Sequence, residues 1–520
     1  MNSREPDAMK DPAANSLLSP DDYPREPVVV ERIPVAYMKA SRFLPMALKD
    51  NYLEIAIVDP DDFETLDALT LASGLPVRAR PGRADDILEA IERLYGAGSQ
   101  SIENIIEEAE QDIVQSTFPS EENAEHLRDM ASEAPIIRLV NRLVLNAVEL
   151  RASDIHFEPY ENEFKVRYRI DGVLNDVESP PKRFQAAIIS RVKIMAKLDI
   201  SERRLPQDGR IKLKIANKEI DFRVSTIPTL FGESLVMRIL DREALVLDLN
   251  RLGFPERLLE RYLKLIYQPH GMVLVTGPTG SGKTSTLYAT LSLINRPENK
   301  IITLEDPVEY QLKGVNQIQV NPKIGLTFAS GLRAIVRQDP DIILVGEIRD
   351  RETAETAIQS ALTGHLLFST LHTNDSAGAI TRLLDMGVES FLLSSTLLGV
   401  LAQRLVRVIC PHCKTATIPP EATPWSDMGI PEKERHRTLF YKGQGCEMCR
   451  HSGYLGRTAI FEYLPVNDGI RAEINAHAST ESIRQVAVEQ GMVTLRQDGW
   501  EKVKAGVTTV SEVLRVTLEE

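Results

Sequence analysis

The stretch GMVLVTGPTGSGKTSTLYATLSLI, residues 271–294, decides the fold of the larger part of this chain. It opens with an apolar run typical of a buried strand and ends with apolar residues at helical spacing. Between them, GPTGSGKT (277–284) matches the pattern G-x-x-x-x-G-K-[ST] in full. Glycines in such a loop let backbone N–H groups surround phosphate oxygens, and the following helix directs its positive end at the anion. The segment therefore predicts a nucleotide-binding α/β domain.

The motif also predicts which residues contact the nucleotide. Lys283 is placed to reach the β- and γ-phosphates, and the Thr284 hydroxyl is a ligand for Mg²⁺. The expected nucleotide site consists of Gly277, Pro278, Thr279, Gly280, Ser281, Gly282, Lys283, Thr284 and Ser285. The alternative is a chance glycine-rich turn, but average residue usage gives only roughly 0.02 such matches in a chain of this length.

Three strand-like segments downstream carry polar residues near their ends. They are IITLEDPVEY (301–310) with Glu305, Asp306 and Glu309, DIILVGEIRD (341–350) with Glu347, and TGHLLFSTLHTND (363–375) with His365 and His372. Ligands of parallel sheets bind at the carboxyl ends of strands, so we expect these residues at that edge as catalytic candidates. A single acid there is more often a cap or a surface charge, and a single histidine is often structural. Clustering after a phosphate loop favours a site.

Glu347 is the predicted group that orients or deprotonates the attacking water. The acid that commonly precedes such a glutamate is replaced here by Gly346. A carboxylate that helps to hold Mg²⁺ must then come from another segment, and Glu305 or Asp306 is the natural candidate.

All four cysteines of the chain stand in two C-x₂-C pairs. These are Cys410 with Cys413 and Cys446 with Cys449. Four thiolates form a closed tetrahedral set that suits a structural Zn²⁺ ion. Disulfides and metal-free thiols are the alternatives, and an intracellular chain disfavours disulfides.

The charge of the chain is unevenly distributed. Acids outnumber bases by 75 to 61, which gives a net charge of −14. Residues 1–27 contribute −3 and residues 101–133 contribute −9, so the remaining body is nearly neutral. This balance argues against a nucleic-acid motor that binds by bulk charge. There is no secretory signal and no apolar run long enough to span a membrane, so we expect a cytoplasmic protein.

Patterns along the chain predict seven regions. They are a disordered tail (1–27), a small α/β domain (28–98), an acidic linker (99–133), an α+β domain (134–245), the nucleotide-binding core (246–404), a tetracysteine subdomain (405–460) and a helical C-terminal region (461–520). Asp171-Gly172 between two alternating runs predicts a hairpin within the α+β domain.

Together, GPTGSGKT, ITLEDPVEY, GLRAIVRQDPDIILVGEIRD, TGHLLFSTLHTND and the cysteine pairs resemble the type II/type IV secretion ATPase superfamily. The type II secretion motors are the nearest resemblance, with type IV pilus assembly ATPases as close neighbours. The likeness is strong over 134–520 and weak over 28–98. It implies a PAS-like domain followed by a RecA-like P-loop ATPase domain. The cofactors implied are ATP, Mg²⁺ and Zn²⁺.

The resemblance also implies partners and further site residues. It implies a homo-hexamer at the inner membrane that drives pseudopilus assembly for protein export, docked on platform proteins through its N-terminal domain. By motif, Arg210 in RLPQDGR, Arg223 in DFRVS, and Arg333 and Arg337 in GLRAIVRQDPD carry over as arginines that approach the γ-phosphate. Ordinary surface arginines are the alternative. Pilus extension is the alternative function, and a nucleic-acid motor or a scaffold without turnover is a more distant one.

Overall fold

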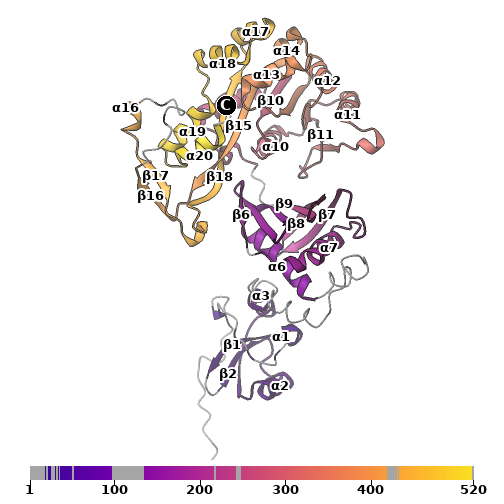
Figure 1. The fold of residues 1–520 in the computed structure, drawn as a ribbon, viewed down its shortest axis with the longest axis vertical. Helices are drawn as coiled ribbons and strands as arrows, with labels where there is room; N and C mark the ends of the chain where they lie inside the picture. The colour runs from indigo at the N-terminus through magenta and orange to yellow at the C-terminus, as the bar shows by residue number, and fades with distance from the viewer. Residues whose placement is uncertain are drawn as a thin grey trace, which may run out of the picture. The chain divides into compact units, whose positions relative to one another are not determined.

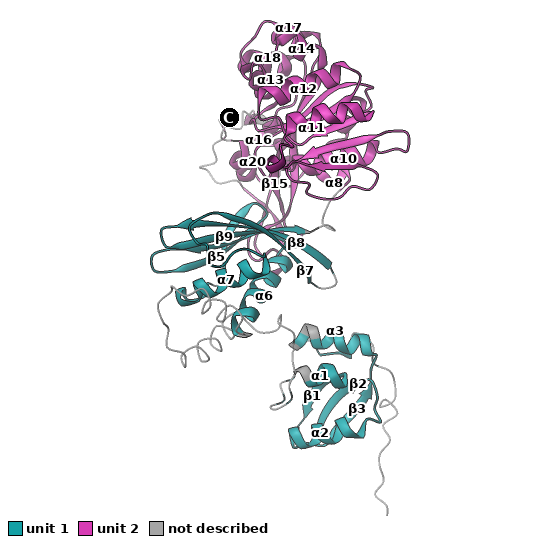
Figure 2. Ribbon diagram, turned by 90° about the vertical axis from the view of Figure 1, so that its right-hand side faces the viewer, with its two compact units in different colours: residues 1–240 teal, residues 241–520 magenta. Residues whose placement is uncertain are grey.

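The structure is a computed structural model that describes most of the chain. The described residues are 18, 22–24, 28, 30, 33, 35–49, 52–95, 134–177, 179–215, 218–241, 247–418, 425, 430 and 432–517. The predicted acidic linker lies outside these residues, as do most of the predicted tail and the predicted boundary at 245. The chain divides into two compact units, residues 1–240 and 241–520 (Figure 2).

The first part of unit 1 is a small α/β fold. Its elements are α1 (Val35–Ser41), β1 (Phe43–Lys49), β2 (Tyr52–Ile57), α2 (Phe63–Ser73), β3 (Val77–Pro81) and α3 (Ala84–Tyr95). β2 lies between β1, to which it is antiparallel, and β3, to which it is parallel. The Asp62 side chain caps α2 through the Thr65 amide, and Gly74 ends the helix in the left-handed conformation. Four of the six residues of β2 are buried in the core, namely Leu53, Ile55, Ala56 and Ile57.

The second part of unit 1 is a six-stranded sheet with helices on one face (Figure 1). Its elements are α6 (Ala134–Glu149), β4 (Ala152–Pro159), β5 (Phe164–Ile170), β6 (Val173–Asp176), α7 (Gln185–Met195), β7 (Gln207–Ile215), β8 (Lys218–Thr229) and β9 (Gly232–Asp241). The strand order is β6-β5-β4-β9-β8-β7. Asp171 and Gly172, both with positive φ, turn the chain between β5 and β6 as predicted.

Unit 2 is built on a seven-stranded sheet of order β12-β11-β13-β14-β10-β15-β18. The strands are β10 (Gly271–Thr276), β11 (Ile301–Glu305), β12 (Asn316–Gln319), β13 (Ile342–Val345), β14 (Leu366–Leu371), β15 (Leu397–Ile409) and β18 (Tyr454–Pro465). The first six in chain order are parallel, and β18 is antiparallel to β15. The predicted parallel α/β core is confirmed.

Helices cover both faces of this sheet, because its strands are apolar on both sides. One cluster joins Met272 and Leu274 of β10 to α11 (Phe328–Ile335), α12 (Arg351–Leu362) and α13 (Ser376–Asp385). The other joins Val273 and Val275 to α8 (Leu249–Leu252), α9 (Glu256–Ile266) and α10 (Lys283–Ile294). The Leu392 and Leu393 side chains of α14 (Ser390–Thr396) join the first cluster.

The cysteine-containing segment leaves the sheet from β15 and returns through β18. β15 runs across the boundary expected at 404, and β18 runs across the one expected at 460. The two strands pair with each other, from Gly399 opposite Pro465 to Ile409 opposite Tyr454. The cysteine-containing segment between β15 and β18 contains β16 (Lys414–Thr417), α16 (Glu432–Arg435) and β17 (Phe440–Gly443). After β18 come four helices: α17 (Asp468–Asn475), α18 (Thr480–Glu489), α19 (Leu495–Lys504) and α20 (Val510–Thr517). Among the described residues, no helix combines the length and apolarity needed to cross a membrane.

Candidate nucleotide and metal sites

The phosphate loop joins β10 to α10, as the motif predicts. Gly277, Gly280 and Gly282 all have positive φ, a conformation that side chains disfavour. A Cβ on Gly277 would lie 2.4 Å from the carbonyl oxygen of Gln403, and one on Gly282 would lie 2.7 Å from the Gln403 side-chain nitrogen. The glycines thus serve the loop conformation and its close packing on β15 at the same time.

Lys283 is buried at the start of α10. Its Nζ donates hydrogen bonds to the carbonyl oxygens of Gly277, at 2.7 Å, and Pro278, at 3.0 Å. Burial lowers the pKa of Lys283 to about 8; the charge of Glu347 opposes this shift and that of Arg404 adds to it. The ammonium group is therefore costly to keep charged here, and an anion beside the loop would stabilise it.

Glu347 and His372 meet at the carboxyl edge of the sheet. Glu347 follows β13 and His372 follows β14, and these strands are neighbours. The His372 Nε2 lies 3.1 Å from one Glu347 carboxylate oxygen, and Arg349 pairs with the other oxygen. The charge of Glu347 also acts on Lys283. The structure thus brings together Glu347 and His372, two of the residues that the sequence places at this edge.

The acids after β11 differ in their surroundings. Glu305 is buried and accepts hydrogen bonds from the hydroxyl groups of Tyr288 and Thr303 and, at 3.1 Å, from the Gln317 amide. Burial raises the pKa of Tyr288, and the Glu305 carboxylate raises it further. Glu305 is therefore committed to a buried network. Asp306, next along the chain, is exposed.

Asp306 and Glu309 lie in the loop that follows this network. The pKa of Arg349 is raised mainly by its hydrogen bond to Glu347 and by the charge of that carboxylate. The negative charge of Asp306 raises it further. The backbone amide of Glu309 donates to the Tyr288 hydroxyl. Of the two expected Mg²⁺ ligands, Asp306 is thus the one whose carboxylate faces solvent near Arg349, and Glu305 is the one whose oxygens are already bonded.

The structure places His365 at the other edge of the sheet from the one expected. His365 precedes β14, whose first residue pairs with Gly271 at the start of β10, so it lies at the amino edge of the sheet. Its Nδ1 lies 2.8 Å from the Ser360 carbonyl oxygen. His365 and His372 flank β14 at opposite ends. The six residues of this strand, at roughly 3.3 Å each, separate them.

Arg333 and Arg337 lie at the C-terminal end of α11 and in the short helical turn that follows it. Arg333 is in the last turn of α11 and pairs with exposed Glu352 at 2.6 Å. Arg337 donates to the Arg333 carbonyl oxygen at 2.7 Å. The following residue, Gln338, accepts a hydrogen bond from Lys300, which precedes β11. This end of α11 therefore lies toward the amino edge.

Arg210 and Arg223 form a directly opposed pair in unit 1. Arg210 of β7 is the cross-strand partner of Arg223 of β8, so both side chains leave the same face of the sheet. The neighbouring pair Ile211 and Phe222 is buried and faces the helices. The two arginines are thus on the face opposite the helices. Two like charges in this position repel each other.

Residues of β15 near the loop were missed by sequence reasoning. Gln403 is 1% exposed; its Oε1 accepts a hydrogen bond from Thr286 at 2.7 Å, while its Nε2 packs on Gly282. Arg404 is 5% exposed and donates to the Asn374 side chain at 3.0 Å. A signal was present, because these two polar residues interrupt the apolar run of a buried strand.

The four cysteines converge on one point. Their sulfur atoms lie within 4.8 Å of one another, and none forms a disulfide. The Sγ–Sγ distances are 3.9 Å for Cys410–Cys446 and 3.7 Å for Cys413–Cys449. Four convergent thiols in this arrangement fit the tetrahedral ligand set of Zn²⁺, which leaves no open position for catalysis.

Comparison with known proteins places this geometry in a family. A family model described as "Type II/IV secretion system protein" matches residues 129–515, and a model of the MshEN domain matches residues 15–101. The chain belongs to the type II/IV secretion system protein family. Its predicted activity, ATP hydrolysis with Mg²⁺ by a P-loop ATPase of secretion systems, is confirmed at the level of this family.

Individual relatives of this type II/IV secretion system protein are similar over nearly the whole chain. "Type II secretion system protein E" of Xanthomonas campestris is 52% identical and covers 94% of this chain and 85% of the relative. "Type IV pilus assembly ATPase PilB" of Myxococcus xanthus is 46% identical and covers 95% and 87%. The crystal structure of the ATPase DotB of Legionella pneumophila matches with a TM-score of 0.54 at 20% identity, covering 73% of this chain and 95% of that one, and supports the fold alone.

Proposed function

We propose that this protein hydrolyses ATP to drive pseudopilus assembly and protein export by type II secretion. The observation that carries the chemistry is the contact between Glu347 and His372 beside the buried Lys283. The assignment to type II secretion is supported by relatives named "Type II secretion system protein E" at 52% and 45% identity. A relative at 46% identity is named a pilus assembly ATPase, which favours pilus extension as the second candidate.

In the proposed site, the backbone amides of the phosphate loop bind the β- and γ-phosphates of ATP. Lys283 exchanges its two loop carbonyl partners for phosphate oxygens. The Thr284 hydroxyl and the Asp306 carboxylate would hold Mg²⁺, which neutralises charge on the phosphates. Glu347 orients the attacking water and accepts its proton, and His372 fixes one oxygen of that carboxylate. Turnover therefore depends on two neighbouring strand ends.

Arg210 and Arg223 are proposed to approach the γ-phosphate from unit 1 of the same or an adjacent subunit in a ring of six. An arginine in this role contributes roughly 10³–10⁵-fold in rate. Arg210→Ala and Arg223→Ala should leave nucleotide binding nearly intact and lower ATP turnover in assembled hexamers. Lys212→Ala, on the same strand as Arg210, is the matched control. Unchanged turnover of both arginine variants in rings of normal mass would remove them from the site.

The N-terminal domain is proposed to dock the ring on platform proteins at the cytoplasmic face of the inner membrane. The match of the MshEN model to residues 15–101 supports a separate binding module there. Purification of the tagged full chain from its native cell decides between the two candidate systems. Capture of the secretion platform is expected, and capture of a pilus platform instead would favour pilus extension.

The cysteine cluster is proposed to hold one structural zinc ion. Reduced, purified protein should contain about one zinc per chain, and a chelator should release the segment between Cys410 and Cys449. Trp425 and Trp500, with ring centroids 6.5 Å apart, lie in the hydrophobic cluster beside it and report the change through tryptophan fluorescence. Cys413→Ser should lose the ion. Protein that holds no zinc but keeps its fluorescence would contradict the proposal.

A further inference from the structure

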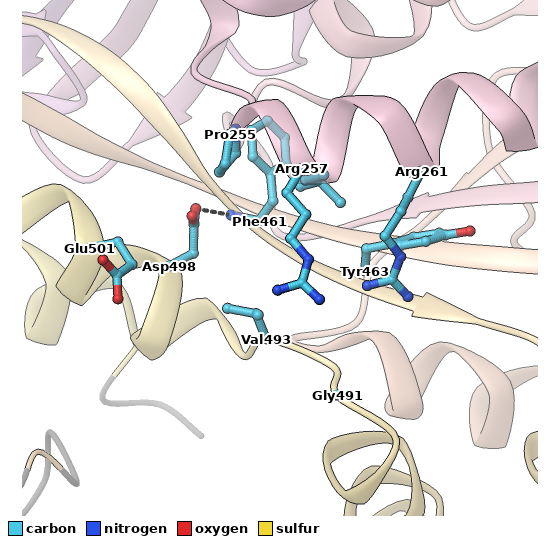
Figure 3. Close-up of a pocket in the computed structure, with 10 residues that line it drawn as sticks. Pro255, Arg257, Arg261, Phe461, Tyr463, Gly491, Val493, Asp498 and Glu501 are labelled. Carbon is cyan, nitrogen blue, oxygen red and sulfur yellow. Dashed lines mark hydrogen bonds between the residues drawn. The ribbon is translucent and has the colours of Figure 1, made fainter.

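A small cavity in unit 2 lies outside the site described above. It has a volume of about 180 Å³ and is enclosed by α9, β18, α19 and the loop between α18 and α19 (Figure 3). Its floor is apolar and consists of Pro255, Leu258, Phe461, Tyr463 and Val493. Sites for small molecules usually occupy ~300–1,000 Å³. This cavity is therefore of a size that suits one inserted side chain.

Two arginines overhang the apolar floor. Arg257 and Arg261 are four residues apart on α9, so they lie on one face of the helix, and both guanidinium groups extend toward the cavity (Figure 3). The Arg261 guanidinium stacks over the Tyr463 ring at 5.2 Å. Arg257 is exposed and, within the part of the chain that the structure describes, has neither a hydrogen bond nor an ion pair. The cavity thus presents uncompensated positive charge.

The acidic residues on the opposite wall do not compensate this charge. Asp498 accepts hydrogen bonds from the Phe461 amide and from Lys502, both at 2.9 Å. Glu501 lies 2.8 Å from the Lys504 ammonium group. Both carboxylates are therefore already engaged by their own helix or by β18. A ligand that completes the cavity must bring an apolar group and a negative charge.

We propose that this cavity docks an acidic segment of a partner protein. One aliphatic or aromatic side chain of the segment packs against Phe461 and Tyr463, and an adjacent carboxylate pairs with Arg257 and Arg261. Guanidinium groups bind carboxylates through two parallel hydrogen bonds, and the apolar floor strengthens these bonds by excluding water. No residue of the phosphate loop lines the cavity, so docking and nucleotide binding involve separate side chains.

A second copy of the chain is the competing occupant. Unit 1 offers an apolar tip between β8 and β9, where Leu230 is 88% exposed. However, the pocket at that tip is lined by Lys182, Arg183 and Arg203, and its one acid, Glu233, already pairs with Lys193. Like charges would then face Arg257 and Arg261, which disfavours this pairing and favours an acidic partner.

The test measures binding of a fluorescein-labelled dodecapeptide of alternating glutamate and leucine to the full chain. Peptides that alternate lysine with leucine, and glutamate with serine, are the chemical controls. We expect binding of the first peptide alone, and Arg257→Glu should weaken it at least about tenfold. Lys264→Glu, which reverses a charge on the same helix outside the cavity, should change it by less than about twofold. Both variants should keep the basal ATPase rate, which reports correct folding.

Three results of the binding assay would overturn the proposal. They are absence of binding to the wild-type chain, equal binding by Arg257→Glu, and equal binding of all three peptides. A lower oligomer mass in Arg257→Glu, measured by light scattering, would assign the cavity to contacts between copies and would also overturn it. If Arg257→Glu loses basal ATPase activity, Arg257→Gln is tested in its place. This variant must still weaken binding of the glutamate–leucine peptide several-fold.

Discussion

The two edges of the seven-stranded sheet use polar side chains in different ways. At the carboxyl edge, Glu347 is held by the side chain of Arg349, from its own loop, and by that of His372, from the loop after β14. At the amino edge, His365 is bonded to the backbone carbonyl of Ser360, and Arg337 to that of Arg333. Glu347 therefore depends on a side chain from the end of a neighbouring strand, whereas His365 and Arg337 depend on backbone atoms of their own segment.

This difference separates chemistry from architecture. A carboxylate, an imidazole and a buried ammonium group that influence one another can respond when a nucleotide changes the local charge. A histidine that bonds to a carbonyl five residues earlier secures a turn. His365 and His372 flank the same strand, β14, and belong to the same motif, so the two edges can be compared directly through them. Substitutions at the two edges should separate loss of turnover from loss of stability.

Between the two edges, the largest effect is expected from Glu347→Gln. The amide keeps the shape of the side chain but cannot accept a proton, so ATP hydrolysis should fall by roughly 10³-fold while ATP still binds. Steady-state phosphate release and equilibrium binding of a fluorescent ATP analogue measure the two effects. Glu352→Gln, on an exposed glutamate that pairs with Arg333, is the control and should keep its activity. Substantial hydrolysis by Glu347→Gln would assign the proton transfer to another group.

An intermediate effect should distinguish the two histidines. His372→Ala removes a partner of the Glu347 carboxylate and should lower turnover by roughly 10–10²-fold with little change in melting temperature. His365→Ala removes a bond to the backbone and should cost about 1 kcal/mol of stability while turnover per folded molecule is nearly unchanged. Parallel kinetics and thermal unfolding of both variants provide the measurement. Equal loss of turnover in both would erase the contrast between the edges.

The phosphate loop was predictable because its function is local. Eight consecutive residues, 277–284, contain the turn, the ammonium group and the hydroxyl, and their positions follow from backbone geometry alone. The cysteine pairs are similar, since four cysteines at this spacing have few other uses. The parallel α/β core and the family followed from the same motifs.

The rest of the site depends on which strands become neighbours. The sequence placed Glu347 and His372 at strand ends, but their contact requires β13 beside β14, an order that no local pattern contains. Gln403 reaches the loop only because β15 lies next to β10. His365 was misplaced because a histidine at each end of a strand gives no indication of which end faces the ligand. Glu305 looked like an open carboxylate, whereas Tyr288 from α10 buries it.

The smallest effect is expected from pH, and it tests the carboxyl edge without a substitution. Burial holds the pKa of Lys283 at about 8, and bound phosphates should raise it because they favour the ammonium form. ATP affinity should thus be fully present below about pH 8 and fall by up to ~10-fold per pH unit above it, since binding then requires uptake of a proton. Titration of a fluorescent ATP analogue at about pH 7, 8 and 9 measures this slope. Lys283→Arg, whose guanidinium stays charged in this range, should show a flat profile. A flat profile in the wild-type protein would mean that Lys283 remains fully charged beside the loop, and that its two carbonyl partners outweigh its burial.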